Sequence, residues 1–151
     1  PKSIFGELAI LDGKPHATSA QAMEDSNIYT MSQSHFKHHL ECIPQLSSNL
    51  IQQMSYKMRK TTGHINTLAS KPVIARLAVL ISKLAEEYGI QENNQTTIKF
   101  NLNQTQIATM IGATKESTNR ALMQLSQFKV LRKEESRIHV LDMQTLHSLS
   151  G

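Results

Sequence analysis

The sequence predicts an α+β fold built from three successive parts. Turn-forming residues separate short β-tolerant stretches over residues 4–31, residues 44–70 carry a narrow apolar stripe with helical spacing, and residues 71–151 mix helix and strand patterns. A chain of 151 residues with 39% hydrophobic and 19% charged residues can bury one or two small cores. We therefore expect three segments, at residues 1–43, 44–70 and 71–151.

The first segment is predicted to be the remnant of a larger sheet or β-roll. Gly6, residues 12–15 and residues 24–27 are turn-forming, and residues 28–31 are typical of a strand. Three short strands cannot cover both of their faces, so most of the sheet is expected upstream of residue 1. A first residue that is Pro1 rather than Met agrees with this expectation.

A long helix is predicted over residues 44–70, after a short helix that opens at Ser34 and ends near Pro44. Its apolar residues recur mostly at intervals of three and four, and Thr61 lies on the same stripe. A narrow stripe favours a two-helix dimer seam over packing onto the helix's own domain. The predicted homodimer seam consists of Leu46, Leu50, Met54, Met58, Ile65 and Leu68.

The third segment begins with a helix that Pro72 starts, at its permitted first-turn position, and that Gly89 ends. Residues 91–95 are predicted to form a polar loop, and residues 97–101 a strand. The broad apolar face of the helix consists of Ile74, Leu77, Ala78, Ile81, Leu84 and Ala85.

The stretch from Asn103 to Leu125 predicts a helix-turn-helix. Asn103 is a favourable N-cap with Gln106 three residues later, and Gly112 permits the positive φ of a tight turn. Thr114 can cap the second helix, and a small residue four positions before the glycine, Ala108, lets the two helices approach closely. The expected inward-facing residues are Ile107, Met110, Ile111, Thr118, Ala121, Leu122 and Leu125.

The second helix of such a unit enters the DNA major groove with its early residues against base edges. Lys115, Glu116, Asn119 and Arg120 point away from the expected inner face. Lysine and arginine donate to guanine, asparagine pairs with adenine, and glutamate accepts from cytosine. An ordinary solvated face on a two-helix corner is the alternative. The caps, the glycine spacing and the side-chain types together favour DNA binding.

A β-hairpin is predicted directly after this unit, because residues 130–133 and 137–141 alternate around a turn at residues 134–136. It would form the wing of a winged helix, with its basic side chains toward phosphates and the two turn glutamates opposing them. The predicted DNA-contacting residues are Thr105, Thr114, Lys115, Glu116, Ser117, Asn119, Arg120, Arg132, Lys133 and Arg137.

The charge distribution agrees with this placement. The net charge is +4; residues 1–43 hold three basic and five acidic residues, residues 44–70 three and none, and residues 71–151 ten and seven. The single cysteine, Cys42, excludes a disulfide within the chain. With neither a leader nor an apolar run long enough to cross a bilayer, the chain is expected in the reducing cytoplasm.

The sequence offers little to catalysis, and no enzyme activity is expected, because it shows no Ser/His/Asp set, phosphate-cradling loop or paired-carboxylate motif. His35, His38, His39 and Cys42 share a helical face that could hold zinc or copper, but such faces are usually solvated, and no metal is expected. A metal-responsive regulator is one rival interpretation. The other is a ligand-sensing or protein-interaction module whose winged helix is a protein contact.

The segment order, together with FGELAILDG at residues 5–13 and TKESTNRAL at residues 114–122, resembles the Crp/Fnr family of bacterial transcription regulators. The resemblance spans nearly the whole chain. It implies a cyclic-nucleotide-binding-like sensor, of which the first half is missing here, a long dimerisation helix and a C-terminal winged helix-turn-helix. It also implies contact with RNA polymerase at promoters.

The family's base-contacting arginine, glutamate and second arginine fall on Lys115, Glu116 and Arg120. Lysine at the first of these positions departs from the family pattern. It keeps the charge but lacks the bidentate fork, which puts the preferred base at that position in doubt.

The effector-binding residues implied by the resemblance depart further from the family pattern. Gly6 and Glu7 match positions that hold ribose and phosphate in members that bind cyclic AMP, but the phosphate-pairing arginine falls on His16 and the adjacent serine on Ala17. Two threonines, Thr61 and Thr62, match hydroxyl residues that face the adenine, or are simply tolerated small polar residues. No cofactor is certain: we expect either a ligand-independent sensor or a small effector other than cyclic AMP in its usual pose.

Overall fold

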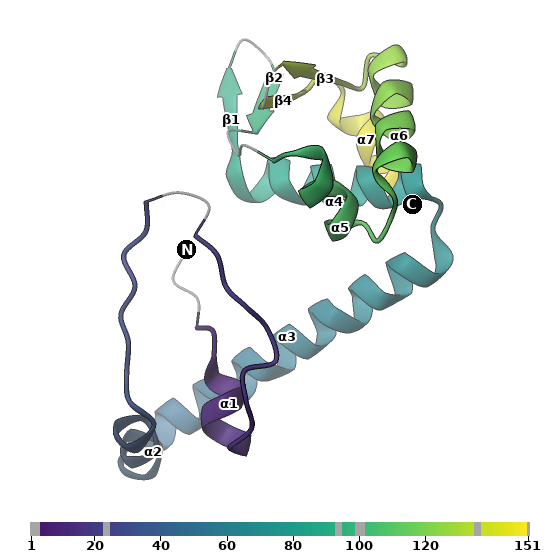
Figure 1. Cartoon of the computed structure of the whole chain (residues 1–151). Coiled ribbons are helices and arrows are strands. Elements are labelled where there is room, and N and C mark those ends of the chain that lie inside the picture. Colours follow the sequence, from purple (N-terminus) through teal and green to yellow (C-terminus); the bar gives the residue numbers. More distant parts are fainter. Residues whose placement is uncertain (1–3, 23–24, 93–94, 99–101, 135–136, 151) are drawn as a thin grey trace. The chain divides into compact units, whose positions relative to one another are not determined.

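A computed structural model describes residues 4–22, 25–92, 95–98, 102–134 and 137–150. The chain divides into two compact units, Pro1–Lys60 and Thr61–Gly151. The predicted α+β class is confirmed, because the described residues form seven helices and one small antiparallel sheet (Figure 1).

The first unit contains two short helices and the larger part of a long one. These are α1 (Glu7–Asp12), α2 (Gln33–Cys42) and the start of α3 (Pro44–Ser70). Glycines in the left-handed conformation bound α1, Gly6 with φ of 81° and Gly13 with φ of 70°. The Ser32 side chain caps α2 by accepting a hydrogen bond from the His35 N–H, two residues earlier than the predicted start at Ser34.

The prediction of short strands over residues 4–31 is wrong for the described residues. One turn of helix, α1, replaces the first stretch, and residues 28–31 form no regular element. A strand requires a neighbour for its N–H and C=O groups, and no neighbouring strand is present among the described residues of this unit. Ile28, Tyr29 and Met31 are accordingly exposed. Residue 24 of the predicted turn lies outside the described residues.

The prediction of a long helix over residues 44–70 is confirmed by α3, which is one continuous ribbon in Figure 1. Leu50 is buried, whereas Ile51, Met58 and Ile65 each expose more than half of their surface. The helix therefore leaves apolar side chains uncovered within this single chain.

The second unit holds the winged arrangement. In chain order its elements are the end of α3, α4 (Val73–Tyr88), β1 (Gly89–Glu92), β2 (Gln95–Ile98), α5 (Gln104–Met110), α6 (Lys115–Gln127), β3 (Leu131–Glu134), β4 (Arg137–Val140) and α7 (Met143–Ser150). The strands form one antiparallel sheet in the order β1-β2-β4-β3, so that β2 joins the β3–β4 hairpin to the β1–β2 hairpin.

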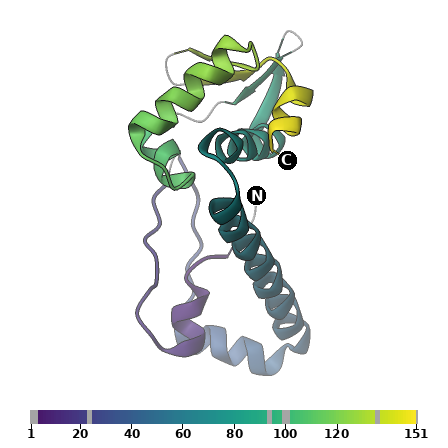
Figure 2. The ribbon, with the colours of Figure 1, turned by 90° about the vertical axis from the view of Figure 1, so that its right-hand side faces the viewer.

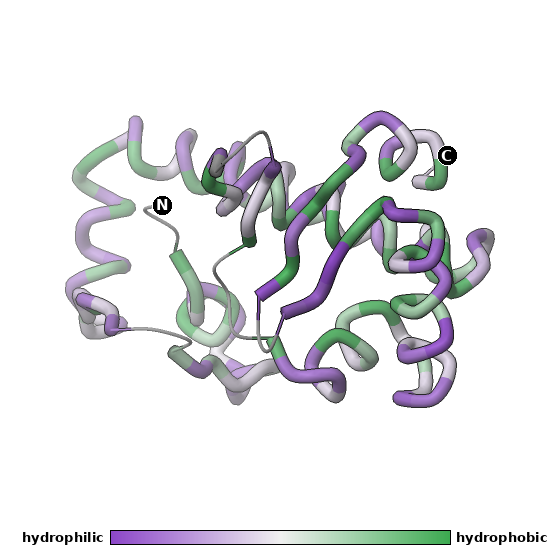
Figure 3. Tube along the Cα trace, turned by 90° about the horizontal axis from the view of Figure 1, so that it is seen from above, coloured by the Kyte–Doolittle hydropathy of each residue, from purple (hydrophilic) through white to green (hydrophobic). Residues whose placement is uncertain are grey.

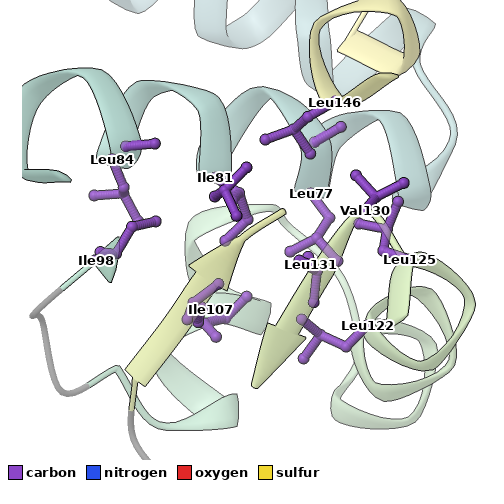
Figure 4. Close-up of a cluster of buried hydrophobic side chains, with 14 of the residues drawn as sticks. Leu77, Ile81, Leu84, Ile98, Ile107, Leu122, Leu125, Val130, Leu131 and Leu146 are labelled. Atoms are coloured by element: carbon purple, nitrogen blue, oxygen red, sulfur yellow. The ribbon is translucent and has the colours of Figure 1, made fainter. Parts of the chain in front are cut away.

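The core of this unit lies between α4, the sheet and α6. Leu77 and Ile81 of α4 are fully buried, as are Ile98 of β2, Ile107 of α5 and Leu125 of α6 (Figure 4). Burying one such side chain contributes roughly 1.5–3 kcal/mol to folding. Figure 3 shows apolar and polar residues interspersed along the helices, and the apolar positions of α4 and α6 that are buried belong to this core.

Several predicted elements of this unit are confirmed. Pro72 is the N-cap of α4, one residue before the first-turn position predicted for it, and Gly89 follows the last residue of the helix as predicted. The predicted apolar face is buried at five of its six positions, with Ile74 partly buried against the core. The predicted hairpin after the helix-turn-helix is formed by β3 and β4, although residues 135 and 136 of its turn lie outside the described residues.

Two predictions near the first hairpin need correction. The polar loop at residues 91–95 is instead partly strand, because β1 pairs with β2 and the Gln91 side-chain amide donates to the Thr96 hydroxyl at 2.9 Å. A strand at the sheet edge needs no apolar alternation, which is why its sequence looks like a loop. The strand predicted at residues 97–101 begins at Gln95, and residues 99–101 lie outside the described residues.

Candidate nucleic-acid interface

The first helix of the helix-turn-helix, α5, begins at a reciprocal capping box. The Asn103 side chain accepts from the Gln106 N–H at 2.9 Å, and the Gln106 side chain accepts from the Asn103 N–H at 2.9 Å. The predicted cap is thereby confirmed. Two of the otherwise unpaired amide groups at this helix start are satisfied locally, which fixes where α5 begins.

The turn between α5 and α6 depends on Gly112. Its φ is 58°, in the left-handed region that favours glycine, as predicted. The Ala113 N–H reaches back to the Ala108 carbonyl at 2.9 Å, which closes the turn. Figure 2 shows α5 and α6 as two helices joined by this tight connection.

The second helix, α6, is capped by Thr114, whose hydroxyl accepts from the Ser117 N–H at 3.2 Å. Its predicted inner face is confirmed, since Thr118, Ala121, Leu122 and Leu125 are all buried. Burial of this face orients the opposite one toward solvent. The side chains on that outer face are exposed, namely Lys115, Glu116, Asn119 and Arg120.

Local hydrogen bonds orient two of these exposed side chains. Gln104, the first residue of α5, donates its amide to the Asn119 Oδ1 at 3.2 Å. The Arg120 guanidinium donates to the Ser117 hydroxyl at 3.4 Å, and the Thr114 hydroxyl donates to that of Ser117 at 3.1 Å. Gln104 was not among the predicted site residues. Its position directly after the Asn103 cap, on the helix that precedes α6, is the only signal the sequence gives.

The pKa of Glu116 is lowered from its ordinary value, chiefly through its own backbone N–H and then through the nearby Thr114 hydroxyl, while Lys115 and Arg120 add positive charge. A charged glutamate only accepts hydrogen bonds. The outer face of α6 therefore presents one carboxylate beside two cations and one amide.

The β3–β4 hairpin adds basic side chains beside this helix. Arg132 and Arg137 are exposed and Lys133 is half-buried. Glu134 offsets part of this positive charge, since its carboxylate lies 3.1 Å from the Arg132 Nε and 3.6 Å from the His139 Nε2. Thr105, in the first turn of α5, is also exposed.

The predicted effector residues of the first unit lie at the start of α1 and in the segment that follows this helix. Glu7 is buried at 6% exposure and its carboxylate lies 2.6 Å from the Lys57 Nζ, which also donates to the Ile4 carbonyl. Burial, the largest single influence, raises the pKa of Glu7, but the hydrogen bond from Lys57, a backbone hydrogen bond and the charge of Lys57 together outweigh it, so the pKa is lowered. His16 lies beside Gly6, with its Cε1 3.3 Å from where a Gly6 Cβ would stand.

The other predicted effector residues are exposed. Ala17 lies in the first unit, whereas Thr61 and Thr62 lie on α3 in the second unit. In the histidine cluster, the Cys42 Sγ lies 3.7 Å from the His38 Nε2. The described residues contain no group of three His, Cys, Asp or Glu side chains arranged to hold a metal ion. Of the helices described, none has both the length and the apolar character needed to cross a membrane.

The residues of the predicted dimer seam fall into a buried or half-buried group and an exposed group. Leu46 and Met54 are half-buried and Leu50 is buried, whereas Met58 and Ile65 are exposed. Leu68 is half-buried beside Gly112, where an added Cβ would meet its Cδ2 at 3.0 Å. Ile51, exposed at 65%, is not in the predicted set although it lies seven residues before Met58.

The chain is similar in sequence to known proteins. Residues 75–149 match the Crp-like helix-turn-helix domain. The chain is 27% identical over 146 residues to the CRP-like cAMP-activated global transcriptional regulator of Mycobacterium tuberculosis, a match that covers 97% of the chain and 65% of that protein. It is 27% identical over 142 residues to the global nitrogen regulator of Synechococcus elongatus, covering 93% of the chain and 64% of that protein. The chain thus spans about two thirds of the length of these relatives.

Solved structures share the fold. FixK2 from Bradyrhizobium japonicum superposes with a TM-score of 0.72 at 20% identity, over 79% of this chain and 59% of that one. A CooA variant from Carboxydothermus hydrogenoformans superposes with a TM-score of 0.70 at 22% identity, over 78% of this chain and 55% of that one.

Proposed function

Since the chain belongs to the Crp/Fnr family of transcription regulators, we propose that it binds specific DNA sites as a homodimer, with α6 in the major groove. The observation that carries this proposal is the outer face of α6, where four polar or charged side chains are exposed beside a fully packed inner face. A helix held so firmly on one side can present the other to DNA at a fixed angle.

Each exposed side chain can form hydrogen bonds with a base edge. Arg120 and Lys115 can donate to guanine, Asn119 can pair with adenine, and Glu116, in its charged form, can accept from the cytosine amino group. Such contacts determine sequence preference. Arg132, Lys133 and Arg137 on the hairpin, with Thr105, Thr114 and Ser117 around the helix starts, are proposed to contact the sugar-phosphate backbone.

The homodimer is proposed to form along α3. Three apolar side chains of α3 lie seven residues apart, namely Ile51, Met58 and Ile65. In the single chain they are 65%, 73% and 58% exposed. Together with positions 54, 61 and 68 they make a heptad stripe with alternating intervals of three and four, the spacing of a two-helix seam. Leu50 is already buried within its own unit, which favours a register through Ile51.

A dimer of this kind would place two copies of α6 in successive major grooves, about 34 Å apart on an imperfect palindrome. The proposal includes a small effector or a ligand-independent state of the sensor, contact with RNA polymerase at promoters, and a cytoplasmic location. Gly6, Glu7, His16, Ala17, Thr61 and Thr62 are the proposed effector-binding residues. Because Lys57 pairs with Glu7, an effector that binds this carboxylate has to compete with that ion pair.

The proposed function is tested by selecting bound fragments from a random DNA pool with the intact protein, with and without candidate effectors. We expect a palindromic consensus whose binding weakens as salt rises yet survives competitor DNA. Binding that shows no sequence preference at any salt concentration contradicts the proposal and favours the winged helix as a protein contact.

The dimer seam is tested by Met58→Glu, with Tyr56→Glu as a matched control. Both residues are exposed, at 73% and 61%, but Tyr56 lies off the heptad stripe. We expect Met58→Glu alone to halve the mass in solution and to weaken DNA binding, because two buried carboxylates would face each other across the seam. An unchanged mass would place the dimer contact elsewhere.

A further inference from the structure

The turn of the helix-turn-helix is held by a side chain from a different helix. Arg76, near the start of α4, donates from its Nη1 to the Ile111 carbonyl at 2.8 Å and to the Gly112 carbonyl at 3.0 Å. These carbonyls lie where α5 ends, and carbonyls at a helix end lack partners within their own helix. One guanidinium therefore satisfies two adjacent acceptors at the point where the chain reverses.

The same turn rests on the end of α3. A Cβ added to Gly112 would lie 3.0 Å from the Leu68 Cδ2 and 3.5 Å from the Arg76 Nη1. Leu68 and Arg76 thus contact the turn together, the first by apolar packing and the second by charged hydrogen bonds. Arg76 keeps this position even though its Nε is buried without a hydrogen-bond partner among the described residues, which is an unfavourable term.

The turn controls the start of the reading helix. Only Ala113 and Thr114 separate Gly112 from Lys115, the first residue of α6. A small displacement of the turn therefore moves Lys115 and Glu116 relative to any base edge, and base contacts depend on hydrogen-bond geometry. Arg76 itself faces the turn carbonyls and is not on the outer face of α6.

We propose that Arg76 is a positioning residue that sets the orientation of α6 for DNA reading, acting through the two turn carbonyls. This inference rests on the proposed function. It predicts that loss of the guanidinium impairs the choice between DNA sequences more than it impairs general attraction to DNA.

The test uses the full chain with Arg76→Met, which keeps an unbranched apolar stem but removes the donors, and Arg76→Lys. Lys83→Met is the matched control, because Lys83 is also a cation on α4 near Met110 and Ile111 and its loss changes the net charge equally. Affinities for a selected site and for random DNA are measured over a range of salt concentrations.

For Arg76→Met we expect the affinity for the selected site to fall about tenfold to a hundredfold, the range of a charged hydrogen bond. Random-DNA affinity and its salt dependence should match those of the Lys83→Met control. Arg76→Lys should recover part of the preference. The inference is overturned if the affinity for the selected site and the affinity for random DNA fall equally, so that their ratio is unchanged.

Amide hydrogen exchange provides a readout that needs no DNA. Arg76→Met should speed exchange at Gly112 and Ala113, whose N–H groups close the turn, while the interior of α4 stays protected. Unchanged exchange at the turn also overturns the inference. If the unmodified protein shows no sequence preference, the proposed function fails, and the exchange result decides separately whether Arg76 holds the turn.

Discussion

The two units of this chain differ in how many of their apolar side chains are buried. In the second unit, α4, the sheet and α6 enclose a shared core in which Leu77, Ile81 and Leu125 are fully buried. In the first unit, Phe36 and Leu50 are the buried apolar side chains among the described residues, while Phe5 and Tyr29 are exposed. The comparison shows that a predicted strand forms only where another strand pairs with it, whereas a helix such as α3 forms without cover because its backbone hydrogen bonds lie within it.

The largest effect expected from this comparison concerns core truncation. Leu125→Ala should cost about 2–5 kcal/mol of stability, because it removes a fully buried side chain. Leu11→Ala, at a residue 39% exposed in the first unit, should stay within about 0.5 kcal/mol. Urea unfolding followed by circular dichroism measures both. Equal costs would mean that the two units are packed alike.

The second prediction compares two glycines in the left-handed conformation. Gly112→Ala should cost about 2–3 kcal/mol, since strain at φ of 58° adds to the contact with Leu68. At Gly13, with φ of 70°, an added Cβ meets nothing within 4 Å, so Gly13→Ala should cost only the strain, about 1 kcal/mol. Thermal melts of the two variants provide the comparison, and a larger loss at Gly13 would refute it.

The third prediction compares helix caps. Asn103→Ala removes one half of a reciprocal capping box and should destabilise the second unit by about 1–2 kcal/mol. Ser32→Ala removes a single long hydrogen bond of 3.4 Å and should cost about 0.5 kcal/mol. Hydrogen exchange at the first turns of α5 and α2 resolves the two effects. Similar exchange rates in both variants would contradict this ranking.

The smallest expected effect is a loss of stability of the first unit at low pH. The pKa of Glu7 is lower in the folded chain than its ordinary value. At pH values above that ordinary pKa, the ion pair with Lys57 therefore stabilises the first unit. This contribution is lost as the pH falls through the lowered pKa. Because Lys57 is 43% exposed, we expect roughly 1 kcal/mol or less.

The acid prediction is measured by following α1 and α3 by NMR during acid titration of the unmodified chain and of Glu7→Gln, with Glu41→Gln as an exposed control. The difference between the unmodified chain and Glu7→Gln should vanish at low pH. A difference that persists in acid would show that the ion pair is not its source.

The helix-turn-helix could be predicted from sequence because its determinants are local. Asn103 and Thr114 cap helices through residues three positions away, and Gly112 adopts a conformation that most side chains disfavour. The buried face of α6 follows directly from helical spacing. Each of these signals can be recognised from residues that are close together in the sequence.

The remaining features depend on distant partners. β1 forms because β2 pairs with it, and residues 28–31 form no strand because no described strand pairs with them. Helix α7, which the sequence did not predict, is short and is held by Leu146, which packs fully into the core of its unit. Arg76 contacts a turn 35 residues away, a relation that no periodicity reveals.

The central claim, that the outer face of α6 reads DNA sequence, is tested most directly by Arg120→Ala, with Arg59→Ala as control. Both arginines are exposed, but Arg59 lies on α3 outside the proposed interface. The measurement is equilibrium binding to a selected site and to single-base variants of it. We predict that Arg120→Ala loses about 1–3 kcal/mol on the selected site and relaxes the preference at one position per half-site, while Arg59→Ala does not. An equal loss for Arg120→Ala on the selected site and on random DNA would contradict the claim.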